Sequence, residues 1–300
     1  MSRLATLANQ VTFKKSFSDK VVLEAFVRDI TGESFTFGII ETEKEFTPSV
    51  GKVAVKYDIF AESEDGRVIV ELQRVRYDNH FDRFMHYFLT SIVEQVGDST
   101  TYAVPRRVIC IVLLTARYKK NDLSGRLVED SMLITDLDPR TVDQQQRHLF
   151  QHKLIFLNPR HAFDQLPAPV REWMHLVEQS LKEPDVDPGN LGEELGLQTP
   201  AAIRAAQLSL WDGLTVDERT KFVNAGQEEQ AMVSVLDDLE EERRLKAEAQ
   251  AQVADAQAQV AKAHAREAEA QAEKAAALAR GAEAQAEINR LRALLREGTI

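Results

Sequence analysis

The sequence is poor in the features that mark secreted and membrane proteins. It has a single cysteine, Cys110, so no disulfide can form within one chain. Its longest apolar run, residues 108–114, is too short to cross a bilayer. Residues 1–10 lack the basic and then apolar order of a signal peptide. These absences predict a cytoplasmic protein without a membrane span, and Cys110, inside the apolar run, is expected to be a buried thiol.

An excess of positive charge is also missing. The net charge of -11 argues against a protein that coats nucleic acid without specificity, because phosphate binding relies on lysine and arginine. Acidic residues are dense at 237–242 and recur in the tail, whereas basic residues cluster at 14–15, 106–107 and 117–120. Any contact with DNA is therefore expected to be local.

Proline is absent from residues 228–296, and Gly281 is the only glycine there. This stretch is rich in alanine, glutamate and glutamine, which predicts a long helix over 228–300. With heptad position a on Leu239, position d is mostly alanine from Ala249 to Ala284. The seam is weak, so the pattern fits a solvated single helix or a loose coiled coil and leaves open whether the tail forms a homo-oligomer.

The 300 residues, of which 44% are hydrophobic, are enough for one core domain and an appendage. We expect a domain at 1–160, a helical connector and subdomain at 161–227, and the long helix at 228–300. Prolines at 184, 188 and 200 predict a loose connector over 182–200. Thr215 and Glu218 form a capping-box pair.

Apolar periodicity predicts an α/β order in the first domain: helix, three strands, helix, strand. Ser18 is the expected N-cap of the first helix and Gly32 its stop. An apolar stripe from Phe81 to Val96, after Asp78, predicts the second helix. The expected helices span 19–31 and 78–96, and the expected strands span 35–40, 53–61, 68–73, 108–114 and 154–157.

The dipeptide Asp65-Gly66 predicts a hairpin with a two-residue loop. This register pairs Asp58 with Gln73 and sets Glu71 diagonal to Asp58, and all three side chains leave the same face. Diagonal neighbours lie about 7–8 Å apart, so both carboxylates could reach one hard cation such as Mg²⁺. The alternative is an edge strand whose carboxylates lie in water.

The segments TFKKSFSDKVVLEAF and KYDIFAESEDGRVIVELQ, with this order of elements, resemble the PD-(D/E)XK nuclease family transposases, also called recombination-promoting nucleases. The resemblance covers residues 10–160 and implies a restriction-endonuclease-like core. It further implies that Asp58 and Glu71 bind Mg²⁺, with Mn²⁺ as a substitute. Gln73 stands where the family usually has a lysine that orients the attacking water or steadies the phosphate, so it inherits that role without the charge.

Four further residues are candidate accessories. Lys56 and Arg83 could supply the charge that Gln73 lacks, and Arg83 and Tyr87, one helical turn apart, could face the site or the DNA backbone. Glu24 could be an additional metal ligand. For Arg83, Tyr87 and Glu24, a solvated surface position is the alternative. His148 and His152 have zinc-ligand spacing but no accompanying pattern, so we interpret them as a polar helical face.

The predicted function is a magnesium-dependent DNA endonuclease, transposase-like and connected with DNA recombination, in which Asp58, Glu71 and Gln73 hydrolyse a phosphodiester bond. No nucleotide-binding loop or nucleophile elbow competes with this hypothesis. The alternative is a catalytically inactive nuclease fold that acts through its tail, by self-association or partner binding.

Overall fold

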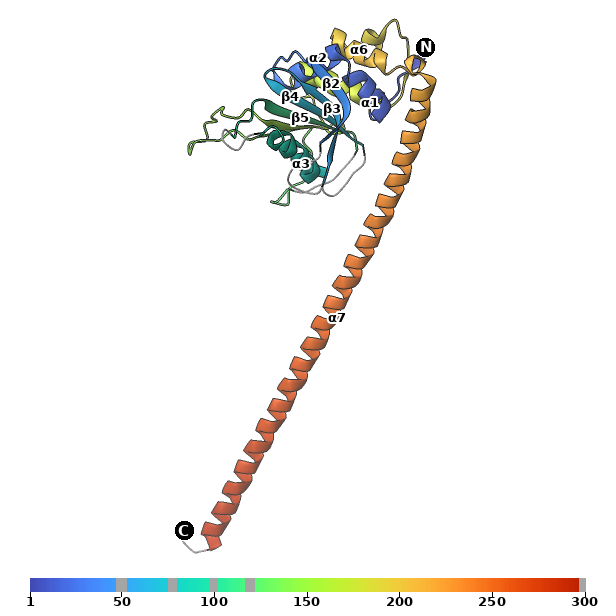
Figure 1. The fold of residues 1–300 in the computed structure, drawn as a ribbon. Helices are drawn as coiled ribbons and strands as arrows, with labels where there is room; N and C mark the ends of the chain where they lie inside the picture. Colours follow the sequence, from blue (N-terminus) through green and yellow to red (C-terminus); the bar gives the residue numbers. More distant parts are fainter. Residues whose placement is uncertain (47–52, 75–79, 98–101, 117–121, 297–300) are drawn as a thin grey trace. The chain divides into compact units, whose positions relative to one another are not determined.

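The computed structural model describes residues 1–46, 53–74, 80–97, 102–116 and 122–296. The chain divides into two units, Met1–Val233 and Ser234–Ile300. The first contains a mixed six-stranded sheet in the order β2-β3-β4-β5-β7-β6 (Figure 1). The strands are β2 (Ile39–Phe46), β3 (Val55–Glu62), β4 (Gly66–Gln73), β5 (Arg107–Leu114), β6 (Met132–Asp136) and β7 (Lys153–Leu157).

The centre of this sheet is parallel and its edges are antiparallel. β4, β5 and β7 run parallel, while β2 and β3 on one side and β6 on the other run antiparallel to their neighbours. β4 and β5 are buried along almost their whole length because helices cover both of their faces. The predicted strands at 68–73, 108–114 and 154–157 are confirmed, and Cys110 is buried in β5 as expected.

Helices cover the two faces of the sheet (Figure 1). On one face lie α1 (Gln10–Phe17), α2 (Lys20–Thr31) and α4 (Ala168–Ser180), whose apolar residues share one core with Ile59, Val70 and Ile111. On the other lies α3 (His80–Val93), whose Phe84 and Phe88 pack in a second core with Ile69. The alternation of side chains along β4 therefore assigns each of its residues to one helical layer.

Both predicted helices are present: α2 begins at Lys20 with a different cap, and α3 ends at Val93 rather than at Val96. Asp19, not Ser18, caps α2, because its carboxylate accepts the N–H groups of Val21 and Val22. Gly32 ends α2 with the left-handed φ that the prediction required. Asp78 lies outside the described residues. The helix α1, which the sequence reasoning missed, is capped by Asn9.

The first predicted strand is misplaced, since residues 35–40 were expected to be extended but the strand β2 begins at Ile39. Phe35 and Phe37 instead stack their rings, with centroids 5.7 Å apart, in the core under α2. Their apolar character serves side-chain packing rather than strand pairing. The sheet also contains β6, which the sequence reasoning did not predict.

The hairpin exists, but its register differs from the prediction by two residues. Phe60 pairs with Ile69 and Glu62 with Arg67, so the turn is centred on Glu64 and Asp65, one residue earlier than expected. Gly66 belongs to β4, and a Cβ atom there would overlap the ring of Phe35. The glycine is thus needed for this close approach and not for the turn.

We expect Gly66→Ala to lower the free energy of unfolding by about 1–3 kcal/mol, the usual cost of forcing extra atoms into a packed core. Gly38→Ala is the matched control, because a Cβ atom at Gly38 would meet nothing within 4 Å. Urea unfolding of both variants measures the difference. Equal midpoints for the two variants would show that Phe35 moves aside freely.

Two other predictions of local structure are wrong. Residues 148 and 152 do not lie on a helix: the Asp138 carboxylate accepts the N–H groups of Leu149, Phe150 and Gln151 and fixes a loop there. His152 is buried, and its Nδ1 accepts the N–H of Val108 at 2.9 Å. Burial lowers the pKa of His152. A neutral histidine held in this way is a structural group.

The expected loose connector at 182–200 is packed. It contains β8 (Asp185–Val186), which pairs with β1 (Ser2–Arg3), and the short helix α5 (Leu191–Glu194). Leu191, Leu195 and Leu197 are buried in the core with α6 (Pro200–Leu208). The prolines therefore bound short elements rather than an unstructured link.

The helical tail is confirmed and is longer than predicted. A 3₁₀ turn, η1 (Trp211–Gly213), leads into α7 (Val216–Arg296). The capping box is present: the Glu218 N–H donates to the Thr215 hydroxyl, and the Thr215 N–H donates to the Glu218 carboxylate. None of the helices in the described ranges combines the length and the apolar character that a bilayer span needs.

Candidate functional site

The candidate site lies where β3 and β4 stop pairing. Their ladder runs from Glu62 opposite Arg67 to Ile59 opposite Val70. Continuing this register places Asp58 directly opposite Glu71, instead of diagonal to it as the sequence predicted. The pairing of Asp58 with Gln73 is thus wrong, because the turn lies one residue earlier than the Asp-Gly rule places it.

The Asp58 and Glu71 side chains each accept a hydrogen bond from the main chain of the facing strand. The N–H of Asp58 donates to Oε1 of Glu71 at 2.9 Å, and the N–H of Leu72 donates to Oδ2 of Asp58 at 3.0 Å. Each carboxylate therefore accepts a backbone N–H of the opposite strand, just beyond the last pair of the ladder, Ile59 with Val70. Asp58 and Glu71 thus occupy directly opposed positions on the two strands, a placement that a shared cation site would need.

The two carboxylates differ in exposure. Glu71 is 1% exposed and lies on β4 between apolar neighbours, whereas Asp58 is partly open to solvent. Burial raises the pKa of the Glu71 carboxyl well above its ordinary value, and the charge of Asp58 raises it further. A buried carboxylate beside a second one is costly unless a cation compensates for it.

Lys14, which the sequence reasoning did not select, brings a positive charge close to Asp58. Its Nζ lies 3.6 Å from Oδ1 of Asp58 and 2.7 Å from Oε1 of Glu43. Phe13 on the same helix is buried in the core and, with Phe17, anchors α1 over the sheet. The helix thereby holds Lys14 beside the acids.

Glu43 is a second residue that the sequence reasoning missed. It accepts from Lys14 and Lys56, and these two lysines lower its pKa to about 2. Its backbone is left-handed, with φ 58°, between the pairs Thr42–Ile59 and Lys44–Tyr57. A non-glycine residue in this conformation stores strain of the kind that gathers at functional sites. Glu43 therefore lies opposite Asp58 and holds Lys14 in place.

From α3, Arg83 and Tyr87 reach the same region. Arg83 donates to Oε1 of Gln73 at 3.4 Å and to the Tyr87 hydroxyl at 3.0 Å. Tyr87 is buried, and its ring packs edge-on against Tyr57 of β3, with centroids 5.7 Å apart. Gln73 is buried as well, so Arg83 supplies a cation beside its carboxamide.

The other two accessory candidates lie differently. Lys56 pairs with Glu43 at 2.7 Å rather than with Asp58 or Glu71. Its pKa is raised mainly by the Glu43 carboxylate. Glu24 accepts the N–H of Phe37 at 2.9 Å and lies near Lys20. These contacts give Glu24 a structural role at the end of the segment 33–37.

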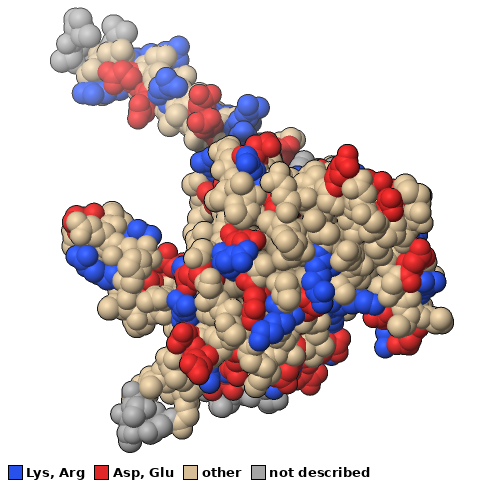
Figure 2. Space-filling model, turned by 90° about the horizontal axis from the view of Figure 1, so that it is seen from above, with Lys and Arg blue, Asp and Glu red and all other residues tan. Residues whose placement is uncertain are grey.

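The donor set fits Mg²⁺ or Mn²⁺, although it is sparse. In the described ranges no three His, Cys, Asp or Glu side chains gather as a ready-made metal cage. Mg²⁺ is commonly bound by one or two carboxylates and keeps its remaining positions for water and substrate phosphates. Asp58 and the buried Glu71 meet that demand. Arginine and lysine lie among acidic residues on the face seen in Figure 2, so the charges of that face are mixed in sign.

Comparison of the chain with protein-family models, curated proteins and solved structures found no match.

Proposed function

We propose that the chain is a magnesium-dependent DNA endonuclease of the PD-(D/E)XK transposase-like type that acts in the cytoplasm. One observation carries this proposal: Asp58 and Glu71 occupy directly opposed positions on the two strands of the hairpin, and Glu71 is buried with a raised pKa. A fold that holds two acids so close together gains from a cation between them. This compensation is the physical reason to expect a metal site.

The chain's own residues divide the work. A bound Mg²⁺ would polarise the phosphate and supply an activated water. Asp58 and Glu71 would hold it, while Lys14 stabilises negative charge on the phosphate beside Asp58. Arg83 fixes the carboxamide of Gln73, which can hydrogen-bond a water or a phosphate oxygen. The positive charge expected from a lysine at position 73 thus comes from α1 and α3.

The proposal predicts that one divalent ion binds in a way that depends on Asp58. In Asp58→Asn, we expect the affinity for Mn²⁺ to fall by more than about tenfold, because even changes to residues that only support a ligand cost that much. The amide can still accept the N–H of Leu72, so the hairpin is retained. Titration calorimetry measures the binding, and nicking of supercoiled plasmid, with Mg²⁺ or with chelator, measures the activity.

Asp65→Asn is the matched control, since Asp65 is an exposed acid in the turn of the same hairpin. It should bind and nick like the unaltered protein. If the unaltered protein neither binds a divalent ion nor nicks plasmid, the endonuclease proposal fails. Nicking that persists in chelator would reject the metal-dependent mechanism.

The second candidate is a catalytically inactive scaffold that acts through its tail. The net charge of -11, the glutamine at position 73 and the exposed helix α7 favour it. A scaffold would show no binding of Mn²⁺ that depends on Asp58. The calorimetric experiment therefore separates the two candidates without any assumption about the DNA that is cut.

A further inference from the structure

One side of α7 carries apolar residues that are open to solvent. At the heptad positions a and d, the larger ones are 44–57% exposed: Met232, Val235, Leu239, Val253, Val260, Ile288 and Leu291. Between them lie alanines, one glycine and a few charged residues. A repeat of seven along a helix brings such residues to one seam, which is typical of a helix that packs against another helix.

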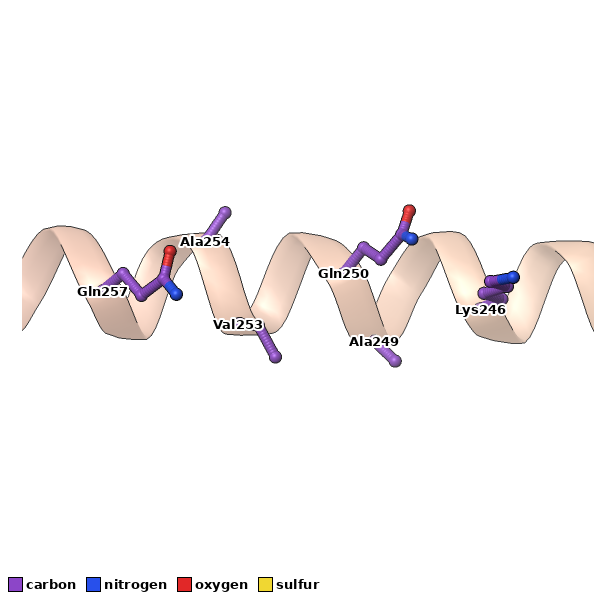
Figure 3. A pocket seen from close by; sticks show the side chains of 6 residues that line it. All are labelled: Lys246, Ala249, Gln250, Val253, Ala254 and Gln257. Atoms are coloured by element: carbon purple, nitrogen blue, oxygen red, sulfur yellow. The ribbon is translucent and has the colours of Figure 1, made fainter.

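The middle of this seam is shallow. A groove there is lined by Lys246, Ala249, Gln250, Val253, Ala254 and Gln257 (Figure 3). Ala249 and Val253 point to the same side of α7 (Figure 3). Alanine covers little of the helix backbone, so a partner helix can approach closely and fill the groove with its own side chains.

A parallel, in-register pair of these helices is disfavoured by charge. Lys246, Glu267 and Lys274 occupy position a, and in a parallel pair each would face the same residue of the other copy. With Glu242 at position d, four layers of like charge would then lie in the seam. Like charges at such close distance repel one another and are costly to remove from water.

An antiparallel pair removes this conflict, because position a of one copy then faces position d of the other. In the register that pairs Val253 with Ala270 of the second copy, every charged seam residue faces the smallest side chains. Written with the second copy's residue last, the pairs are Glu242 with Gly281, Lys246 with Ala277, Glu267 with Ala256 and Lys274 with Ala249. At the two ends large faces large: Met232 with Leu291 and Val235 with Ile288.

Neighbouring registers fit less well. A shift of one heptad in one direction sets Glu242 against Ile288, which buries a carboxylate against an apolar side chain. A shift in the other direction pairs Glu242 with Lys274 but sets Val235 against Gly281 and Met232 against Ala284, which leaves voids at both ends. Among these three registers, the sizes of the seam residues therefore favour the one that pairs Val253 with Ala270.

We propose that the occupant of this seam is the same helix of a second copy of the chain, packed antiparallel and centred between residues 261 and 262. The proposal does not depend on nuclease activity. From the rise of about 1.5 Å per residue, Ser234 of one copy and Ser234 of the other lie about 80 Å apart along the helix axis.

Cross-linking of full-length cysteine variants tests the arrangement. In the proposed register Val253 faces Ala270 of the second copy, whereas the two copies of Val253 are about 25 Å apart along the axis. A disulfide needs Cα atoms within about 7 Å. We therefore expect a mixture of Val253→Cys and Ala270→Cys, one of them tagged, to give the mixed disulfide as the main product under mild oxidation. Either variant alone should give at most a tenth as much.

The unaltered chain is the control, since its Cys110 is buried. Circular dichroism checks that both variants keep their helix, and sedimentation equilibrium should give twice the mass of 33.8 kDa. Self-cross-linking of Val253→Cys would show a parallel pair and overturn the proposal. A monomeric mass at the concentration used for cross-linking would also overturn it.

Discussion

Glu71→Gln is expected to abolish metal-dependent nicking and, at the same time, to stabilise the metal-free protein at pH 7 by about 1–3 kcal/mol. Glutamine keeps the oxygen that accepts the Asp58 N–H but removes a charge that is buried beside another carboxylate. Loss of activity with a gain in stability is the signature of a residue retained for function at the expense of the fold. A purely structural glutamate would give the opposite change in stability.

The pH dependence gives the sign of this effect independently. Burial and the nearby charge of Asp58 raise the pKa of Glu71 in the folded protein above its ordinary value of 4.5. The stabilisation that comes from protonated Glu71 is complete below pH 4.5 and is lost as the pH rises through the folded pKa. The stability advantage of Glu71→Gln should therefore grow from pH 4.5 towards neutral pH.

Urea unfolding at several pH values, in chelator and in Mg²⁺, measures both effects. Mg²⁺ should stabilise the unaltered protein and leave Glu71→Gln unchanged, because only the carboxylate pair binds the ion. Glu64→Gln, an exposed change in the same hairpin, is the control and should alter neither property. A Glu71→Gln protein that nicks plasmid normally would remove Glu71 from the active site.

Lys14→Met is expected to slow nicking about 100-fold to 1000-fold at saturating Mg²⁺, the range found when one stabilising donor is removed from an active site. Lys14 is held within 3.6 Å of Asp58 by its bond to Glu43. The affinity for the metal should not fall, because removal of a cation beside Asp58 leaves the carboxylate pair more negative. The expected result is a lower turnover at unchanged or tighter metal binding.

Lys15→Met provides the matched control for Lys14. Lys15 is the next residue on α1, but its Nζ donates to Glu218 and to the Gly213 carbonyl and not to Asp58 or Glu71. Single-turnover nicking rates of the two variants should differ by at least tenfold, a conservative part of the expected effect of Lys14→Met. Equal rates would place the catalytic charge elsewhere, with Arg83 as the next residue to test.

Local patterns predicted much of the fold. The strands β4, β5 and β7, the helix α3 and the capping box at Thr215 depend on periodicity and on contacts close in sequence. The helical face predicted at residues 148–152 is instead a loop, because the Asp138 carboxylate accepts three of its backbone N–H groups. Nothing in the spacing of His148 and His152 indicates that arrangement.

The candidate site was predicted in part. The hairpin indicated Asp58 and Glu71, but its register was wrong because Gly66 serves the contact with Phe35 and not the turn. Lys14 and Glu43 were not predicted, because they approach Asp58 only when α1 packs on the sheet and β2 pairs with β3. A sequence signal for Lys14 does exist: it lies between Phe13 and Phe17, whose spacing anchors one face of a helix to a core.

The hydrogen bonds from the N–H groups of Asp58 and Leu72 to the carboxylates of Glu71 and Asp58 tie assembly of the site to folding of the backbone. Each carboxylate accepts a main-chain N–H of the facing strand. The two strands therefore cannot pair up to the open end of the hairpin without bringing both carboxylates together. The amide protons of Asp58 and Leu72 are therefore natural reporters: their exchange with solvent deuterium follows opening of the site itself.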